Sequence, residues 1–344
     1  MYTTKSGEEI FVIDGHTHFW DGSPANQKNV HGKQFIDCFF NYHTGLSPKS
    51  EVWPKDKFEK YDAKTMYDDL FVKGYVDMAI LQPTYLTDFY VEGFNTTERN
   101  YSMKQQHPDR FICNGAFDPR DGTKGLEYLH ALKEKYDIKG VKLYTAEWRG
   151  ESKGYKLSDK ECYRYLEECE KLGIKNIHVH KGPTIIPLNR DAFDVADVDD
   201  AATSFQNLNF IVEHCGLPRL DDFCWIATQE TNVYAGLAVA IPFIHSRPGY
   251  FAHIISELLF WLGPDKILFG SDYGIWTPKW IIDKFMAFEL PKDVAAETGV
   301  TLDLEAKKKI LGLNAAKLYG VDVAAQKDKL GYKKKVLAGG GWFR

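Results

Sequence analysis

Eight short apolar segments, each followed by a segment long enough for a helix, constrain the fold of this chain more than any other feature. They lie within residues 10–20, 76–81, 111–116, 140–143, 176–180, 209–214, 233–237 and 266–270. Consecutive parallel strands need a crossover connection, and a helix is the usual one. The order therefore predicts an α/β fold, a (β/α)8 or TIM barrel, in one domain over residues 1–320.

The two ends of this alternation carry further expectations. A helix over residues 302–319, capped by Gly320, is predicted to pack outside the barrel as a C-terminal helical extension. Residues 321–344 contain Lys333–Lys335 and Gly339–Gly341, and we expect a tail that is loosely ordered or crosses to a second subunit. Residues 21–60 show no clear period and are expected to form a long loop over the barrel mouth, with His31, Asp37 and His43 as candidate pocket groups.

Composition narrows the class of partner. The 344 residues carry a formal charge of −5 and no dense basic block before residue 333, so a nucleic-acid surface is not expected. Neither a secretory signal nor an 18-residue apolar run occurs, which predicts a cytoplasmic protein without membrane contact. The six cysteines form no CxxC pair and are expected to be reduced and structural. Small-molecule chemistry is the expectation that remains.

Titratable side chains end several of the predicted strands. The first strand ends in HTH, so His16 and His18, two residues apart, point to one side. The strands over 140–143, 176–180, 209–214 and 266–270 contribute Lys142, His180, His214 and Asp272. In a (β/α)8 barrel these ends share one mouth, and imidazoles with one carboxylate suit zinc, with manganese and iron as alternatives. His178 is expected one layer deeper, and Asp272 is either a metal ligand or a general base.

The motifs IDGHTHFW, GVKL, HVHKGP, IVEHCG and LFGSDYG together resemble the signature of the amidohydrolase-2 family of metal-dependent barrels, which includes aminocarboxymuconate-semialdehyde decarboxylase. The resemblance covers about residues 10–320. Carried over position by position, it implies that His16, His18, His180 and Asp272 bind one divalent metal. It also implies that His214 is the catalytic acid or base beside the metal, with Asp272 as a second catalytic group.

The reaction is less constrained than the family. The first motif is HTH and lacks the Glu-x-His form of some salicylate-type decarboxylases, so a single carboxylate ligand is expected. We expect a metal-dependent lyase, a non-oxidative decarboxylase of a small carboxylated, unsaturated or aromatic acid; the alternative is a lactone or amide hydrolase, or a hydratase, that uses a metal-activated water. Lys142, as a plain ammonium or as a carbamylated metal bridge, and Arg247 are candidate substrate-binding residues. Relatives of this kind also imply a homodimer.

Overall fold

Eight parallel strands, β3 to β10, form the centre of the computed structural model, which describes residues 1–332. The strands pair in the orders β3-β4-β5 and β6-β7-β8-β9-β10. Single parallel bridges, Gly115 with Val141 and Thr17 with Tyr273, join the two sheets at both seams. The predicted barrel is therefore confirmed. Its strands are β3 Ile13–Thr17, β4 Met78–Leu81, β5 Phe111–Cys113, β6 Gly140–Leu143, β7 Asn176–His180, β8 Asn209–Glu213, β9 Val233–Gly236 and β10 Ile267–Leu268.

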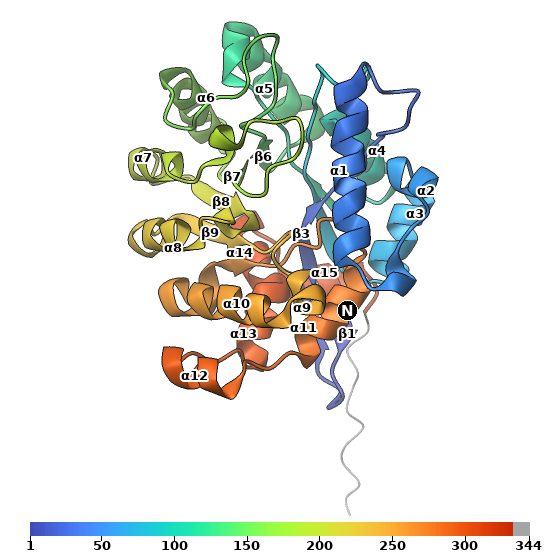
Figure 1. The fold of residues 1–344 in the computed structure, drawn as a ribbon, viewed down its shortest axis with the longest axis vertical. Coiled ribbons are helices and arrows are strands. Elements are labelled where there is room, and N and C mark those ends of the chain that lie inside the picture. The colour runs from blue at the N-terminus through green and yellow to red at the C-terminus, as the bar shows by residue number, and fades with distance from the viewer. Residues whose placement is uncertain (333–344) are drawn as a thin grey trace, which may run out of the picture.

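Helices follow the strands and cover the outside of the ring (Figure 1). The principal ones are α3 Ala63–Tyr67, α4 Thr97–Gln106, α5 Gly122–Tyr136, α6 Lys160–Lys171, α7 Asp197–Ser204, α8 Leu220–Gln229, α10 Pro248–Leu262 and α11 Pro278–Ala287. Shorter elements are β1 Tyr2–Thr3, β2 Glu9–Ile10, α2 Lys55–Glu59, α9 Phe243–Ser246 and α12 Lys292–Thr298. Within residues 1–332, none of the helices has the length and apolar character that a membrane crossing requires.

Apolar side chains fill one half of the barrel interior. Ile13, Ile80, Ile211 and Leu268 come from strands around the ring and pack into one buried cluster. Fully burying each such side chain contributes about 1.5–3 kcal/mol. Because this half is filled by hydrocarbon, the polar inward-facing residues gather at the opposite end, where the strands terminate.

Residues 21–60 differ from the expected irregular loop. They contain a long helix, α1 Val30–Leu46. Its N-cap is Asn29, whose side chain accepts a hydrogen bond from the His31 backbone N–H. The helix buries Phe35, Ile36 and Phe39. The buried face of the helix also includes His43. Because histidine is polar, the helical spacing of buried residues is not visible in the sequence when only apolar side chains are counted.

The C-terminal segment confirms one expectation and corrects another. Over 302–319 the chain forms α13 Leu304–Lys308, a π-helical turn Lys309–Leu313 and α14 Asn314–Tyr319, and Gly320 ends it in the left-handed conformation. Within the predicted tail, α15 Val323–Lys329 packs against the barrel instead of leaving it: the Gln326 side chain donates to the Asp109 carbonyl. Lys333–Lys335 and Gly339–Gly341 lie outside the described residues.

Candidate metal centre

Three side chains meet at the mouth of the barrel. His16 and His18 come from the end of β3, and Asp272 follows β10, its neighbour in the ring. His18 Nε2 lies 3.0 Å from His16 Nε2 and 3.2 Å from Asp272 Oδ1. The His16 Nε2 to Asp272 Oδ1 distance is 3.6 Å, and all three residues are buried. One point in space is therefore within reach of two imidazoles and a carboxylate.

In His16 and His18, the group next to Nδ1 decides which of the two ring nitrogens carries the proton. His18 Nδ1 lies 2.7 Å from the Gln82 carbonyl oxygen, which can only accept, so Nδ1 carries the proton. His16 Nδ1 lies 2.8 Å from Glu213 Oε2, a carboxylate oxygen. Both Nε2 atoms are then bare, and two nitrogen lone pairs face an anionic oxygen. Such a convergence is repulsive by itself and is what a divalent cation requires, so the residues fit a metal.

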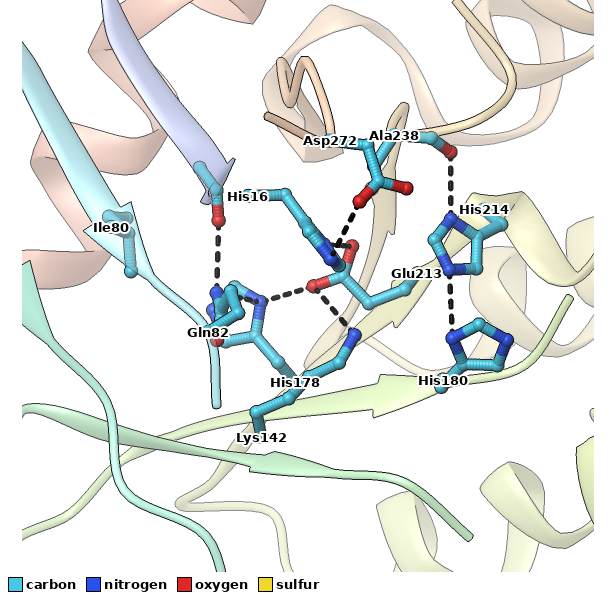
Figure 2. Close-up of polar contacts among 12 residues, drawn as sticks. His16, Ile80, Gln82, Lys142, His178, His180, Glu213, His214, Ala238 and Asp272 are labelled. Carbon is cyan, nitrogen blue, oxygen red and sulfur yellow. Dashed lines mark hydrogen bonds and ion pairs between the residues drawn. The ribbon is translucent and has the colours of Figure 1, made fainter. Parts of the chain in front are cut away.

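His180 and His214 form a second pair beside this cluster (Figure 2). His214 Nδ1 donates to the Ala238 carbonyl, 2.9 Å away, which leaves His214 Nε2 as an acceptor for His180 Nδ1, also at 2.9 Å. The proton of His180 is therefore on Nδ1, and its Nε2 is bare and buried, with no hydrogen-bond partner among residues 1–332. His180 lies outside the three-residue group but has the tautomer of a fourth ligand.

The backbone conformation of His214 and Asp272 directs their side chains towards the mouth of the barrel. His214 has a φ of 63° and Asp272 a φ of 58°, in the left-handed region that non-glycine residues seldom adopt. Glu213 faces the barrel interior, and simple alternation would turn the next residue, His214, away from it. The left-handed turn returns His214 to the mouth. Asp272 is held in turn by its backbone N–H, which donates to the His16 carbonyl at 3.0 Å. Strained backbone of this kind is concentrated at functional sites.

A charged layer lies directly beneath the three ligand atoms. The Glu213 carboxylate is 2.6 Å from His178 Nδ1 and 3.8 Å from Lys142 Nζ, in addition to its contact with His16. Lys142 and Glu213 are each 1% exposed, so both charges are removed from water. Tyr319 lies 2.8 Å from the other nitrogen of His178, which places His178 one layer deeper, as its strand position predicts.

The pKa values in this layer follow from burial and charge. Desolvation alone would raise the pKa of Glu213, but His16 and Lys142 hold it well below its usual value. Desolvation lowers the pKa of Lys142, and Glu213 opposes that shift. The same balance acts on Asp272: burial raises its pKa, whereas the neighbouring imidazoles of His16 and His18 bring it down to about 2. The carboxylates are therefore anionic at neutral pH, as metal ligation requires.

A cavity with about 470 Å³ of empty volume opens onto the cluster. Its floor contains His16, His18, Asp272, His180 and His214. Its walls are apolar and aromatic, and they come from α1 and from the loops after β4, β6, β7, β9 and β10: Phe39, Tyr42, Phe94, Tyr144, Ile185, Val239, Ile275 and Trp276. A volume of this order suits a small organic molecule.

The structure brings most of the predicted site residues together at the mouth, along with two residues that were not predicted from the sequence, Glu213 and Gln82. Lys142 lines the cavity, whereas Arg247 is exposed and its guanidinium stacks on Tyr250, at 4.5 Å from the ring centre. The structure does not bring Arg247 to the cavity. Glu213 and Gln82 were not predicted, although both follow the inward-facing alternation of their strands. His43 is structural: its Nδ1 bonds the Ile275 carbonyl, and its Nε2 accepts from the Trp53 N–H.

Comparisons with known proteins agree with this geometry. A family model described as Amidohydrolase matches residues 13–321. Among solved structures, an uncharacterized TIM-barrel protein from Bordetella bronchiseptica has a TM-score of 0.68 at 16% identity and covers 93% of this chain and 100% of its own. The 2,6-dihydroxybenzoate decarboxylase from Rhizobium has a TM-score of 0.57 at 15% identity, covering 91% and 100%.

The 4-oxalomesaconate hydratase from Rhodopseudomonas palustris has a TM-score of 0.56 at 19% identity, covering 93% and 99% of the two chains. At these identities the likeness establishes the fold, and the named activities belong to those proteins. No curated protein matches the chain. Because the family model spans nearly the whole barrel, this protein belongs to the amidohydrolase family.

Proposed function

We propose that this protein is a metal-dependent lyase, a non-oxidative decarboxylase of a small carboxylated, unsaturated or aromatic acid. The observation that carries the proposal is the contrast inside the cavity, where a wall of aromatic and aliphatic side chains faces the ligand cluster at the floor. Flat, unsaturated acids match such a wall. Solved neighbours with similar folds include the 2,6-dihydroxybenzoate decarboxylase and a 5-carboxyvanillate decarboxylase with bound manganese.

His16, His18 and Asp272 would hold one divalent metal, with His180 Nε2 as the fourth protein atom. Zinc is the metal we propose, and manganese and iron accept the same donors. When bound, the metal supplies a Lewis acid that holds the substrate oxygens and stabilises developing negative charge. Glu213 supports this site by keeping the proton of His16 on Nδ1.

The apolar wall favours loss of carbon dioxide over hydrolysis. A carboxylate bound against Phe94, Tyr144 and Trp276 loses the water that stabilises its localised charge. In the transition state that charge spreads into the unsaturated carbon skeleton, which an apolar surface penalises less. Hydrolysis instead needs a positioned water, and the aromatic side chains leave less room for one.

Proton transfer to the carbon that loses carbon dioxide is assigned to His214. The hydrogen bond from its Nδ1 to the Ala238 carbonyl makes Nε2 the basic atom, so Nε2 first takes up a proton from solvent and then delivers it to the carbon that the departing carbon dioxide leaves. His214 lines the cavity with its ring centre 5.5 Å from that of His16. His180 Nδ1–H occupies Nε2 in the structure, so proton transfer requires this hydrogen bond to open. Lys142 is proposed to orient the substrate carboxylate as an ammonium.

A screen of the metal-loaded protein tests the reaction directly. Carbon dioxide release is measured for a panel of aromatic and unsaturated acids, in parallel with hydration of unsaturated acids and ring-opening of lactones. We expect carbon dioxide release, reduced about 10²–10⁴-fold in His214→Gln, which is the usual contribution of a positioned acid or base. His130→Gln is the matched control, because His130 is an exposed histidine on α5. Turnover of lactones or hydration without carbon dioxide release would replace the decarboxylase assignment.

A further inference from the structure

A second cavity, with about 490 Å³ of empty volume, adjoins the metal cavity. It lies over the ends of β4, β5 and β6, on the side of the mouth away from the metal ligands. Thr84, Lys142 and Tyr144 line both cavities, so the two chambers share one wall. A molecule held at the metal centre by one end is therefore next to the second chamber.

The second chamber contains buried polar atoms that make no hydrogen bond within the described residues. Tyr144 and Tyr155 are each 7% exposed, and Lys142 is 1% exposed. In the described part of the chain, neither tyrosine hydroxyl nor Lys142 Nζ has a hydrogen-bond partner. An unpaired buried hydroxyl is destabilising, and a ligand that pairs it recovers that free energy. The chamber is therefore built to receive hydrogen-bonding groups.

The charges of the second chamber argue against an anionic ligand. Arg149 is already surrounded by carboxylates: its guanidinium lies 3.2 Å from Asp118, 3.6 Å from Glu147 and 3.8 Å from Asp121. Asp118 is also paired with Arg120. Three acidic side chains thus share two guanidiniums. Neither guanidinium is left to pair with a further carboxylate.

The remaining walls suit a flat ring that carries hydroxyl groups. Phe117, Tyr85 and Tyr155 provide aromatic surface, and Tyr128 and Tyr85 add hydroxyls that already bond each other at 2.8 Å. Glu147 is buried, and burial raises its pKa to about 7, so near neutrality it both donates and accepts hydrogen bonds. Neutral hydroxyls pair with such groups in either direction.

We propose that the second chamber binds an uncharged, hydroxyl-bearing distal part of the same substrate whose carboxylate enters the metal chamber. This extends the proposed function by naming the far end of the substrate, and it rests on that function only for the placement of the acid end. Tyr155 is the specificity-determining residue, because it lines the second chamber and not the metal chamber, and its hydroxyl there has no hydrogen-bond partner among the described residues.

Three arylpropanoates that differ only at the distal end provide the test. They are 3-phenylpropanoate, 3-(3,5-dihydroxyphenyl)propanoate and 3-(4-carboxyphenyl)propanoate, titrated calorimetrically into the zinc-loaded protein. One hydrogen bond changes affinity by about 2- to 12-fold. We expect the dihydroxy probe to bind at least about 4-fold more tightly than the unsubstituted probe, and the dicarboxylate more weakly than either.

Variants locate the effect. In Tyr155→Phe the advantage of the dihydroxy probe should fall to about 2-fold or less, whereas Tyr163→Phe, on α6 and outside both chambers, should leave it unchanged. An unchanged advantage in Tyr155→Phe, or a dicarboxylate that binds more tightly than the dihydroxy probe, overturns the proposal. Loss of the advantage in Tyr42→Phe, which lines only the metal chamber, also overturns it. The readout needs no turnover, so a protein without decarboxylase activity still tests this chamber separately.

Discussion

Replacing Glu213 with Gln removes one negative charge from beneath the candidate metal centre while keeping the shape of the side chain. Glu213 lies 3.8 Å from Lys142 Nζ, a separation at which two unit charges attract by about 4 kcal/mol at an effective dielectric constant of about 20. The substitution leaves the Lys142 ammonium buried without its counter-charge. Breaking a buried pair from one side costs about 3–5 kcal/mol, so we expect a loss of that size in the unfolding free energy at pH 7.

The loss should depend on pH in a defined direction. Desolvation already lowers the pKa of Lys142, and without Glu213 the pKa falls further. A lysine whose folded pKa lies below its unfolded pKa makes the folded state bind fewer protons, so stability rises with pH. Glu213→Gln should therefore be more destabilised relative to wild type at pH 6 than at pH 9. Urea unfolding of the metal-free protein at the two pH values measures this difference.

The same substitution should weaken metal binding. Glu213 Oε2 lies 2.8 Å from His16 Nδ1, and loss of a carboxylate beside a metal-ligating histidine typically costs 10- to 100-fold in metal affinity. Competition with a chelator gives the affinity. Asp77→Asn is the matched control: Asp77 is a fully buried carboxylate at the opposite end of the barrel, where it accepts from the Val12 N–H. It should lower stability but leave metal affinity unchanged. A Glu213→Gln variant that binds metal as wild type does would refute the reasoning.

Four further predictions follow from the site and its surroundings. Elemental analysis should find a single equivalent of metal in wild type and none in His16→Ala or His180→Ala, and two equivalents in wild type would contradict a mononuclear site. His214→Gln should keep stoichiometric metal while turnover falls, whereas a parallel loss of metal would make His214 a ligand. Burial lowers the pKa of His43 to about 4, so the contribution of its neutral form to the free energy of unfolding, about 3 kcal/mol, is present above pH 6.5 and is lost as pH falls towards 4. The free energy of urea unfolding should therefore change less between pH 7 and pH 4.5 in His43→Gln than in wild type. A homodimer should give a sedimentation mass near twice the 39.4 kDa of one chain, and a mass of one chain at micromolar concentration would contradict it.

Local patterns determined the barrel and the candidate ligands. Apolar runs of strand length alternate with helical segments, and neighbouring residues decide both signals, so the strand order followed without any tertiary contact. His16, His18, His180 and Asp272 were identifiable because parallel strands bring their ends to one mouth. The helix α1 was not predicted, because its period is complete only when His43 counts as a buried residue. His43 is buried since the Ile275 carbonyl, far along the chain, pairs with its ring.

Only the tertiary structure decided how these side chains act on one another. The pairing of Glu213 with Lys142 spans 71 positions and depends on β6 and β8 both flanking β7 in the ring. The return of His214 to the mouth depends on one left-handed residue, which strand alternation does not contain. Arg247 could not be assigned to surface or site from its neighbours, and its stacking on Tyr250 places it outside. The second chamber is the clearest case, because its walls come from β6, α5 and the loops after β4, β5 and β6, whose residues meet only after the barrel closes. The periodicity of a segment indicates which of its side chains are buried. The partner of a buried charge or hydroxyl, in contrast, is a residue distant in the chain, so only the tertiary structure identifies it.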